Sequence, residues 1–216
     1  IADDALGVIN HTFVMVSAIK GATVMLCLMD GVITPTNNTL PDTPIYLRGT
    51  PVKKSVYPVG TFGSLNAESA LEVSSNIYMM QLAMLEGHAK YVPNSSLTMD
   101  SDIFTKMRGY FSQFGLGQKT GIDLPGEATG IEGPTVNEYG EPANGSLLDL
   151  SYGNYDAYTL IQLAQYISTI ANGGQRMKPY LVDSIQQTGN DGSAGQVGTK
   201  TTPTVLSTVD APESYF

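Results

Sequence analysis

The sequence predicts an α/β domain of the α+β type, in which helices dominate and strands are few. Apolar residues recur at helical spacing over 159–171, and a nearly unbroken apolar run covers 13–29. Only two short stretches, 45–47 and 180–185, have the character of strands. With 216 residues, of which 42% are hydrophobic, the chain is long and apolar enough for one domain with a substantial core.

The first half is expected to contain four helices. Phe13–Met29 is predicted as a buried helix, because Lys20 is its only charge and Gly31 ends the run. A loop with one short strand at 45–47 follows, since Pro, Asn and Thr cluster between 31 and 51. Apolar residues on one face predict three further helices, over 66–73, 77–85 and 102–111.

The second half is expected to be less regular. Residues 115–145 are rich in Gly and Pro and are predicted as an extended segment with many turns. The segment over 159–171 is predicted as the clearest amphipathic helix, with its apolar residues on one face, and Gly173-Gly174 ends it. A strand is predicted at 180–185, a mobile polar loop over 186–204, and the start of a new helix after Ser207 or Thr208.

Charge and cysteine content exclude several classes of protein. The net charge is -9 with only 11 Lys and Arg and no basic run, which excludes a nucleic-acid partner. Cys27 is the single cysteine, so the chain has no internal disulfide. The apolar run is nearly long enough to cross a bilayer, but Ser17, Lys20 and Thr23 within it favour a buried core helix. The chain begins with Ile1, so we expect it to be an internal piece of a longer protein.

Ser17 and Lys20 form the most informative pair. They are three residues apart, so a helix places both side chains on one face. Burial among apolar residues should lower the pKa of the lysine, and a free amine beside a hydroxyl activates a serine nucleophile where no histidine is available. The pair predicts acyl transfer. Two alternatives remain open: Ser-x-x-Lys also occurs by chance, and a lysine can extend its ammonium out of an apolar helix without any function.

Ser74-Ser75-Asn76 precedes a predicted helix and offers a second motif. The Ser74 hydroxyl can relay a proton, and the Asn76 carboxamide can bind a substrate amide. The alternative is an N-cap, in which Ser74 or Ser75 satisfies the first backbone N–H groups of the helix. Ser64-Leu65-Asn66 has the same pattern and shows how easily it arises.

Lys119-Thr120-Gly121 completes a trio of motifs, S-x-x-K, S-x-N and K-T-G, that is typical of penicillin-binding proteins and related β-lactamases. We do not assign it as the third motif, because it lies among turn residues and before the helix over 159–171. Instead, its surroundings, Phe114–Glu127 (FGLGQKTGIDLPGE), resemble a segment of class B penicillin-binding proteins that lies between the second and third motifs. The residues around 31–34, 74–79 and 158–174 resemble other parts of that family, in the same order.

The resemblance covers nearly the whole chain and is nearest to the penicillin-binding protein 2B type of Gram-positive bacteria. It implies the penicillin-binding transpeptidase or serine β-lactamase-like fold, with the helical subdomain and part of the antiparallel sheet. It also implies that Ser17 is the acylated nucleophile, Lys20 its general base and Ser74 a proton relay, while Asn76 binds the substrate. No metal or cofactor is implied.

The activity implied is that of a D,D-transpeptidase that cross-links peptidoglycan through an acyl-serine. Its partners would be the stem peptides that end in D-Ala-D-Ala, β-lactam antibiotics and proteins of the cell-division machinery. The protein would act at the extracytoplasmic face of the bacterial membrane, held by an anchor that this chain does not contain.

The chain departs from the family pattern in two places. The family usually has Pro-Gly directly before the nucleophile, whereas Met15-Val16 stand here, and no second Lys-Thr-Gly follows Gly174. We therefore expect residues 1–216 to be a transpeptidase domain without its C-terminal strands, with little activity by itself. A β-lactam sensor or a cell-division scaffold of the same fold is the alternative, and a serine β-lactamase is a weaker one because no deacylating carboxylate can be placed.

Overall fold

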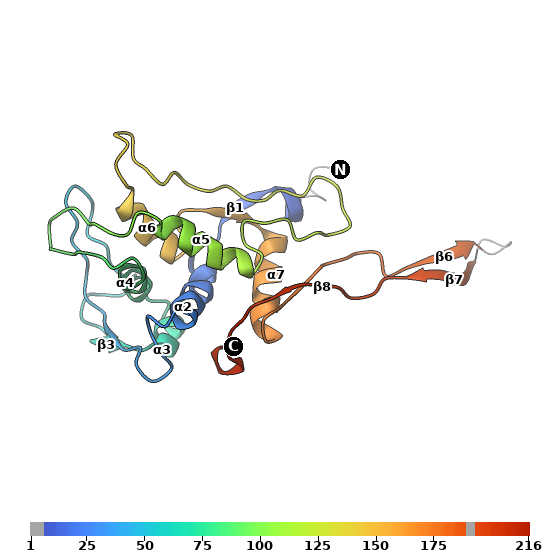
Figure 1. Cartoon of the computed structure of the whole chain (residues 1–216), viewed down its shortest axis with the longest axis horizontal. Coiled ribbons are helices and arrows are strands. Elements are labelled where there is room, and N and C mark those ends of the chain that lie inside the picture. The colour runs from blue at the N-terminus through green and yellow to red at the C-terminus, as the bar shows by residue number, and fades with distance from the viewer. Residues whose placement is uncertain (1–6, 189–192) are drawn as a thin grey trace.

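Helix α2 (Lys20–Met29) lies at the centre of the helical part of the protein, in a computed structural model that describes residues 7–188 and 193–216. Its buried residues include Met25, Leu26 and Cys27, and it packs against α4 and α5. Figure 1 shows these helices grouped together, with α7 beside α2. No helix within the described residues has the length and apolar character needed to cross a membrane.

Four predicted helices are confirmed to within two residues at each end. They are α3 (Ala67–Glu72), α4 (Asn76–Glu86), α5 (Ile103–Gln113) and α7 (Leu160–Ala171). Side-chain caps fix two of the starts: Asn66 and Thr159 each accept the backbone N–H three residues ahead within a capping box. One further helix, α6 (Asn144–Ser151), has no signal that the sequence analysis recognised.

The apolar run over 13–29 is a helix only in its second part. Its first residues belong to strand β1 (Thr12–Val14), and a 3-10 turn, η1 (Val16–Ile19), leads into α2. Strand β1 pairs antiparallel with β4 (Ala157–Thr159), so that Phe13 lies opposite Tyr158. Aromatic and β-branched residues favour such pairing, and this tertiary partner overrides the helical appearance of the run.

Strands are more numerous than the sequence predicts, and all of them form antiparallel pairs within the described part of the chain. The short pairs are β2 (Leu40–Pro41) with β3 (Ser64–Leu65), and β5 (Gln175–Met177) with β8 (Val205–Thr208). The predicted strand at 45–47 is reduced to single bridges from Ile45 to Lys53 and from Leu47 to Ser95. Thr208 ends β8 and starts no helix; a short 3-10 turn, η2 (Glu213–Tyr215), follows.

The segment over 186–204 was expected as a loop, but much of it forms a hairpin that projects from the body (Figure 1). Strand β6 (Ser184–Thr188) pairs with β7 (Ala194–Lys200), so the strand predicted at 180–185 begins four residues later. Backbone pairing holds a polar, Gly-containing hairpin without any hydrophobic alternation, which explains why the sequence pattern missed it. Residues 189–192 of the predicted loop lie outside the described residues.

The apolar face of α7 is only partly buried. Leu160 and Ile167 of its apolar stripe are 43% and 49% exposed. The buried face carries polar residues instead, namely Gln162, Gln165, Tyr166 and Thr169. These residues have specific partners, because Gln162 and Gln165 donate to the backbone carbonyls of Gln118 and Met177. Hydrogen bonds therefore help to hold this helix against the body, while Leu163 and Ile170 pack against the core and the rest of the apolar stripe is uncovered.

A buried ion pair joins α5 to the start of β4. Asp156 is 1% exposed and accepts hydrogen bonds from Arg108 Nε at 2.8 Å and Nη2 at 2.7 Å. The backbone N–H of Gly133 donates to the same carboxylate at 2.8 Å. A carboxylate that is removed from water keeps its charge only with such partners, so this pair fixes the extended segment over 115–145 to the helical core.

Candidate active site

Ser17 and Lys20 lie at the junction of η1 and α2. Ser17 is exposed in the 3-10 turn, whereas Lys20 opens the α-helix and is only 2% exposed. The spacing of three residues brings the lysine side chain beneath the serine, as predicted. The pair therefore combines an accessible hydroxyl with an amine that is shielded from solvent.

The second motif lies where α3 is followed by α4. Ser75 is the N-cap of α4, and its Oγ accepts the backbone N–H of Tyr78 at 3.0 Å. Ser74 is thereby left free of any capping role, and Asn76 is the first residue of the helix. The N-cap interpretation is therefore confirmed for Ser75, while the proton-relay role of Ser74 stays a prediction. In the look-alike Ser64-Leu65-Asn66, the asparagine caps α3.

All three N–H groups of the Lys20 ammonium point at the second motif. Its Nζ donates to Ser74 O at 2.6 Å, Ser74 Oγ at 2.9 Å and Asn76 Oδ1 at 2.7 Å. Ser74 Oγ in turn donates to Ser17 Oγ at 2.9 Å. Among the described residues no hydrogen bond joins the side chains of Ser17 and Lys20 directly, so Ser74 Oγ connects them. The fold brings together all four residues that the sequence singled out.

Burial lowers the pKa of Lys20 to about 8. The cause is loss of water around the ammonium, which disfavours the charged form. This direction agrees with the prediction from the apolar run. No carboxylate within the described residues forms an ion pair with Lys20 that would oppose the effect. A fraction of the amine is therefore neutral near pH 8 and can accept a proton.

Val16, directly before Ser17, has a left-handed backbone with φ of 50°. This conformation is rare for a β-branched residue and common for glycine, the residue usual at this place in the resembling family. Gly153 holds the turn: its carbonyl accepts the Val16 N–H at 2.9 Å, and a Cβ on Gly153 would lie 2.0 Å from Val16 O. The sequence analysis missed Gly153, which is 137 residues away in the chain.

Val16→Gly is expected to stabilise the chain by about 0.5–1 kcal/mol. Relief of the left-handed strain gains about 1–2 kcal/mol, and the larger entropy of glycine in the unfolded chain offsets about 0.5–1 kcal/mol of it. Urea denaturation of the 216-residue chain measures this difference. Val14→Gly, in the extended strand β1, is the matched control and should lose stability. Equal losses for both variants would contradict the assigned strain.

Tyr166 of α7 contacts the start of α2. Its hydroxyl accepts the backbone N–H of Ala22 at 3.0 Å, which satisfies one of the free N–H groups at the start of α2. A Cβ on Gly21 would lie 2.6 Å from this hydroxyl, so glycine is required for the approach. The aromatic residue was missed as part of the site because its contribution depends on packing between helices that are distant in sequence.

Lys119-Thr120-Gly121 lies in a structural loop. The Thr120 hydroxyl and backbone N–H, and the Gly121 N–H, all donate to the carboxylate of Glu127. Asp123 accepts the N–H groups of Leu181 and Val182 and ties the same loop to the segment before β6. The motif belongs to none of the strands in the described chain. This placement supports the decision not to assign it as the third motif.

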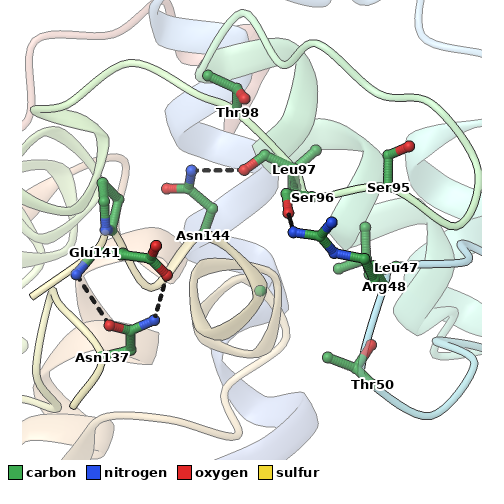
Figure 2. Close-up of a pocket in the computed structure, with 12 residues that line it drawn as sticks. Leu47, Arg48, Thr50, Ser95, Ser96, Leu97, Thr98, Asn137, Glu141 and Asn144 are labelled. Carbon is green, nitrogen blue, oxygen red and sulfur yellow. Dashed lines mark hydrogen bonds between the residues drawn. The ribbon is translucent and has the colours of Figure 1, made fainter. Parts of the chain in front are cut away.

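A cavity of about 520 Å³ lies away from these residues, between the loops around 47–50, 95–98 and 137–145. Figure 2 shows Arg48 and Glu141 on opposite sides of it, with Asn144 between them. Asn144 donates to the carbonyl of Leu97, and Arg48 donates to Ser96. None of the residues that line the cavity is Ser17, Lys20, Ser74 or Asn76. The cavity is therefore separate from the four candidate site residues.

The sequence profile of the penicillin-binding protein transpeptidase domain matches residues 3–214. The chain belongs to this family. Penicillin-binding protein 2A of Bacillus subtilis is 43% identical over 99% of the chain, and penicillin-binding protein 2B of Streptococcus pneumoniae is 35% identical over 98%. The structure of penicillin-binding protein 2B from strain R6 of S. pneumoniae superposes with a TM-score of 0.86. The resemblance to class B penicillin-binding proteins is confirmed.

The penicillin-binding proteins in these comparisons are much longer than the chain. It spans 29% of the B. subtilis protein and 34% of the S. pneumoniae structure, while 99% and 98% of the chain itself is matched. The fold of this family combines helices with an antiparallel sheet, as predicted, and the chain contains part of it. Activity, substrates and partners depend on the whole length and are treated as proposals below.

Proposed function

We propose that the chain is part of a D,D-transpeptidase that cross-links peptidoglycan through an acyl-enzyme on Ser17. The observation that carries this proposal is the hydrogen-bonded series Lys20 Nζ, Ser74 Oγ, Ser17 Oγ, which starts at a buried amine and ends at an exposed hydroxyl. A serine whose proton has a path to a neutral amine is an activated nucleophile. The family membership supports the same reaction.

The distances support proton transfer through Ser74, with both hydrogen bonds reversed once Lys20 is neutral. With Lys20 neutral, the Ser17 proton passes to Ser74 Oγ while the Ser74 proton passes to Lys20 Nζ. The Ser17 oxygen then attacks the carbonyl of the penultimate D-alanine, and the resulting lysine ammonium returns a proton through Ser74 to the leaving amine of the terminal D-alanine. An amine from a neighbouring stem peptide attacks the ester and frees Ser17. A β-lactam ring is opened by the same attack and leaves a stable acyl-serine.

Asn76 is the proposed substrate-binding residue. Its Oδ1 is held by Lys20, and its Nδ2 has no partner within the described part of the chain. An amide NH₂ group without a protein partner can donate to a carbonyl of the stem peptide. The oxygen bound to Lys20 also fixes which way the amide points, so Asn76 presents only donors to the substrate.

We also propose that this chain belongs to a longer parent protein, which supplies the remainder of the domain. The chain covers about a third of its relatives. The apolar stripe of α7, with Leu160 and Ile167 exposed, needs a cover. The parent would provide a Lys-(Ser/Thr)-Gly strand, a membrane anchor and contacts to cell-division proteins at the extracytoplasmic face. The chain alone should acylate little, because loss of one oxyanion donor costs about 10²–10³ in rate.

Labelling of the parent protein with a fluorescent penicillin tests the proposal. Peptide mapping should find the adduct on Ser17, and Ser64→Ala, in the look-alike motif, should label like the wild type. Addition of a stem-peptide donor and an acceptor amine should then give a cross-linked product. A permanent adduct without any product would indicate a β-lactam sensor, and rapid release of hydrolysed penicillin a β-lactamase. An adduct at another residue, or none, would overturn the role of Ser17 and leave a scaffold.

A further inference from the structure

Ser55 lies against the start of α4, although it is 20 residues earlier in the chain. Its side chain is buried, with 6% exposure of the residue. The Oγ atom accepts the backbone N–H groups of Asn76 at 3.1 Å and Ile77 at 3.2 Å. These are two of the four N–H groups that every α-helix leaves free at its start. Ser55 therefore acts as a second cap, which adds to that of Ser75.

The hydrogen atoms in this cluster can be assigned by counting. Ser75 Oγ lies 3.1 Å from Ser55 Oγ and donates its single hydrogen to Asp42 Oδ1 at 3.0 Å. Ser55 must then be the donor between the two serines, and its lone pairs accept both N–H groups of α4. Ser75 and Asp42 are also buried, at 1% and 8% exposure. Hydrogen-bond donation thus runs in one direction, from Ser55 to Ser75 and from Ser75 to Asp42, because the carboxylate can only accept.

In the sequence, Ser75 lies between Ser74 and Asn76, the two residues that accept hydrogen bonds from Lys20 Nζ. Ser74 provides two acceptors and Asn76 one, so these two residues take all three N–H groups of the ammonium. Ser74 has a left-handed backbone with φ of 55°, a conformation that the surroundings must hold. A movement at the start of α4 therefore changes both the positions of these acceptors and the access of water to Lys20 Nζ.

We propose that Ser55, oriented by Asp42 through Ser75, is a positioning residue that holds Ser74 and Asn76 around Lys20 Nζ. The inference rests on the proposed function for its effect on acylation, but the arrangement of Lys20 can be measured without any reaction. A plain cap would stabilise α4 and leave the lysine unaffected. The two possibilities differ in what they predict for the titration of Lys20.

Titration of Lys20 in the 216-residue chain is the first test. The ¹³Cε resonance of labelled lysine is followed against pH and assigned with Lys20→Met. In Ser55→Ala the midpoint should rise by at least about half a pH unit, because a loosened second motif admits water to the ammonium. Ser55→Cys, which keeps the volume and a weak S–H donor, should fold readily and give a smaller rise.

Ser69→Ala provides the matched control. The Ser69 hydroxyl accepts the N–H of Asn66 at 3.0 Å in the capping box of α3, so its loss removes a comparable cap outside the site. This variant should lower the melting temperature and leave the Lys20 midpoint unchanged. If the Ser55 variants behave in the same way, with an unchanged or lower midpoint, Ser55 is only a cap and the proposal is overturned.

Acylation of the parent protein is the second test. Ser55→Ala should lower the rate of penicillin acylation by about 10- to 100-fold, since small displacements of catalytic groups have such effects. The midpoint of the pH–rate profile should rise with the Lys20 titration. If the wild-type parent fails to acylate, the proposed function fails while the NMR result still decides the role of Ser55. Wild-type rates in Ser55→Ala would contradict its role in positioning.

Discussion

Lys20→Met is expected to slow acylation of the parent protein by fluorescent penicillin by roughly 10²–10⁴-fold, the range for loss of a general base. Methionine has a similar length and fits the apolar surroundings, so the helix keeps its packing. The proton of Ser17 loses its acceptor, because Ser74 Oγ then has no amine to which it can pass a proton. Acylation rates are measured by quenching the labelling reaction at a series of times and reading the fluorescence of the protein band on a gel. Ser17→Ala serves as the control that takes up no label.

The pH profile makes this prediction specific. With a pKa of about 8, Lys20 becomes neutral as the pH rises, so wild-type acylation should increase through pH 8 and level off above it. Lys20→Met should lose this rise. Lys119→Met is the matched control, since Lys119 is exposed and lies in the Lys-Thr-Gly that we do not assign to the site. A flat wild-type profile, or equal losses in both variants, would rule out Lys20 as the base.

The same pKa predicts how stability depends on pH. The unfolded chain holds the Lys20 proton up to about 10.5, its ordinary pKa, whereas the folded chain releases it near 8. Between these values the unfolded state binds more protons, so Lys20 makes the free energy of unfolding rise as the pH increases across this window. Below pH 8 the full cost of the buried ammonium is present. The same burial favours the neutral amine, which is the form that Lys20 needs for its proposed role as a general base.

Asp156→Asn is expected to lower the free energy of unfolding of the chain by about 3–5 kcal/mol, the usual loss when one member of a buried ion pair is removed. The amide removes the buried charged partner of the Arg108 guanidinium, which then keeps only the more exposed Glu132 at 3.4 Å, and it turns an NH₂ group toward donors. The N–H of Gly133 also loses a charged acceptor. Since whole domains are stable by only about 5–15 kcal/mol, the variant should be close to unfolding.

Urea denaturation followed by circular dichroism measures this loss. Asp100→Asn is the matched control, because Asp100 pairs with His88 at the surface, where both side chains are largely exposed. It should cost less than about 1 kcal/mol. The double variant Arg108→Met/Asp156→Leu should recover part of the loss, because no buried charge remains unpaired. Equal effects of Asp156→Asn and Asp100→Asn would show that the buried pair does not anchor the segment over 115–145.

Local signals in the sequence were sufficient where a helix depends on its own residues. Caps and apolar spacing located α3, α4, α5 and α7 to within two residues. They failed where a distant partner decides. Phe13 and Val14 look helical but pair with β4. The stripe of α7 leaves Leu160 and Ile167 exposed, because polar residues on its other face find specific partners. Hydrophobic pattern cannot foresee a helix that is held by hydrogen bonds.

The candidate site shows the same division. The sequence alone determined that Ser17 and Lys20 share one side of a turn and that apolar neighbours lower the lysine pKa. It also determined that Ser74 and Asn76 lie at the start of a helix. Only the tertiary structure decided that Ser74 bridges serine and lysine, that Gly153 holds the turn at Val16, and that Ser55 caps α4 from outside. The reason is physical. Spacing along a helix is fixed by local geometry, whereas these contacts join residues that are 20 to 137 positions apart and form only when the chain packs.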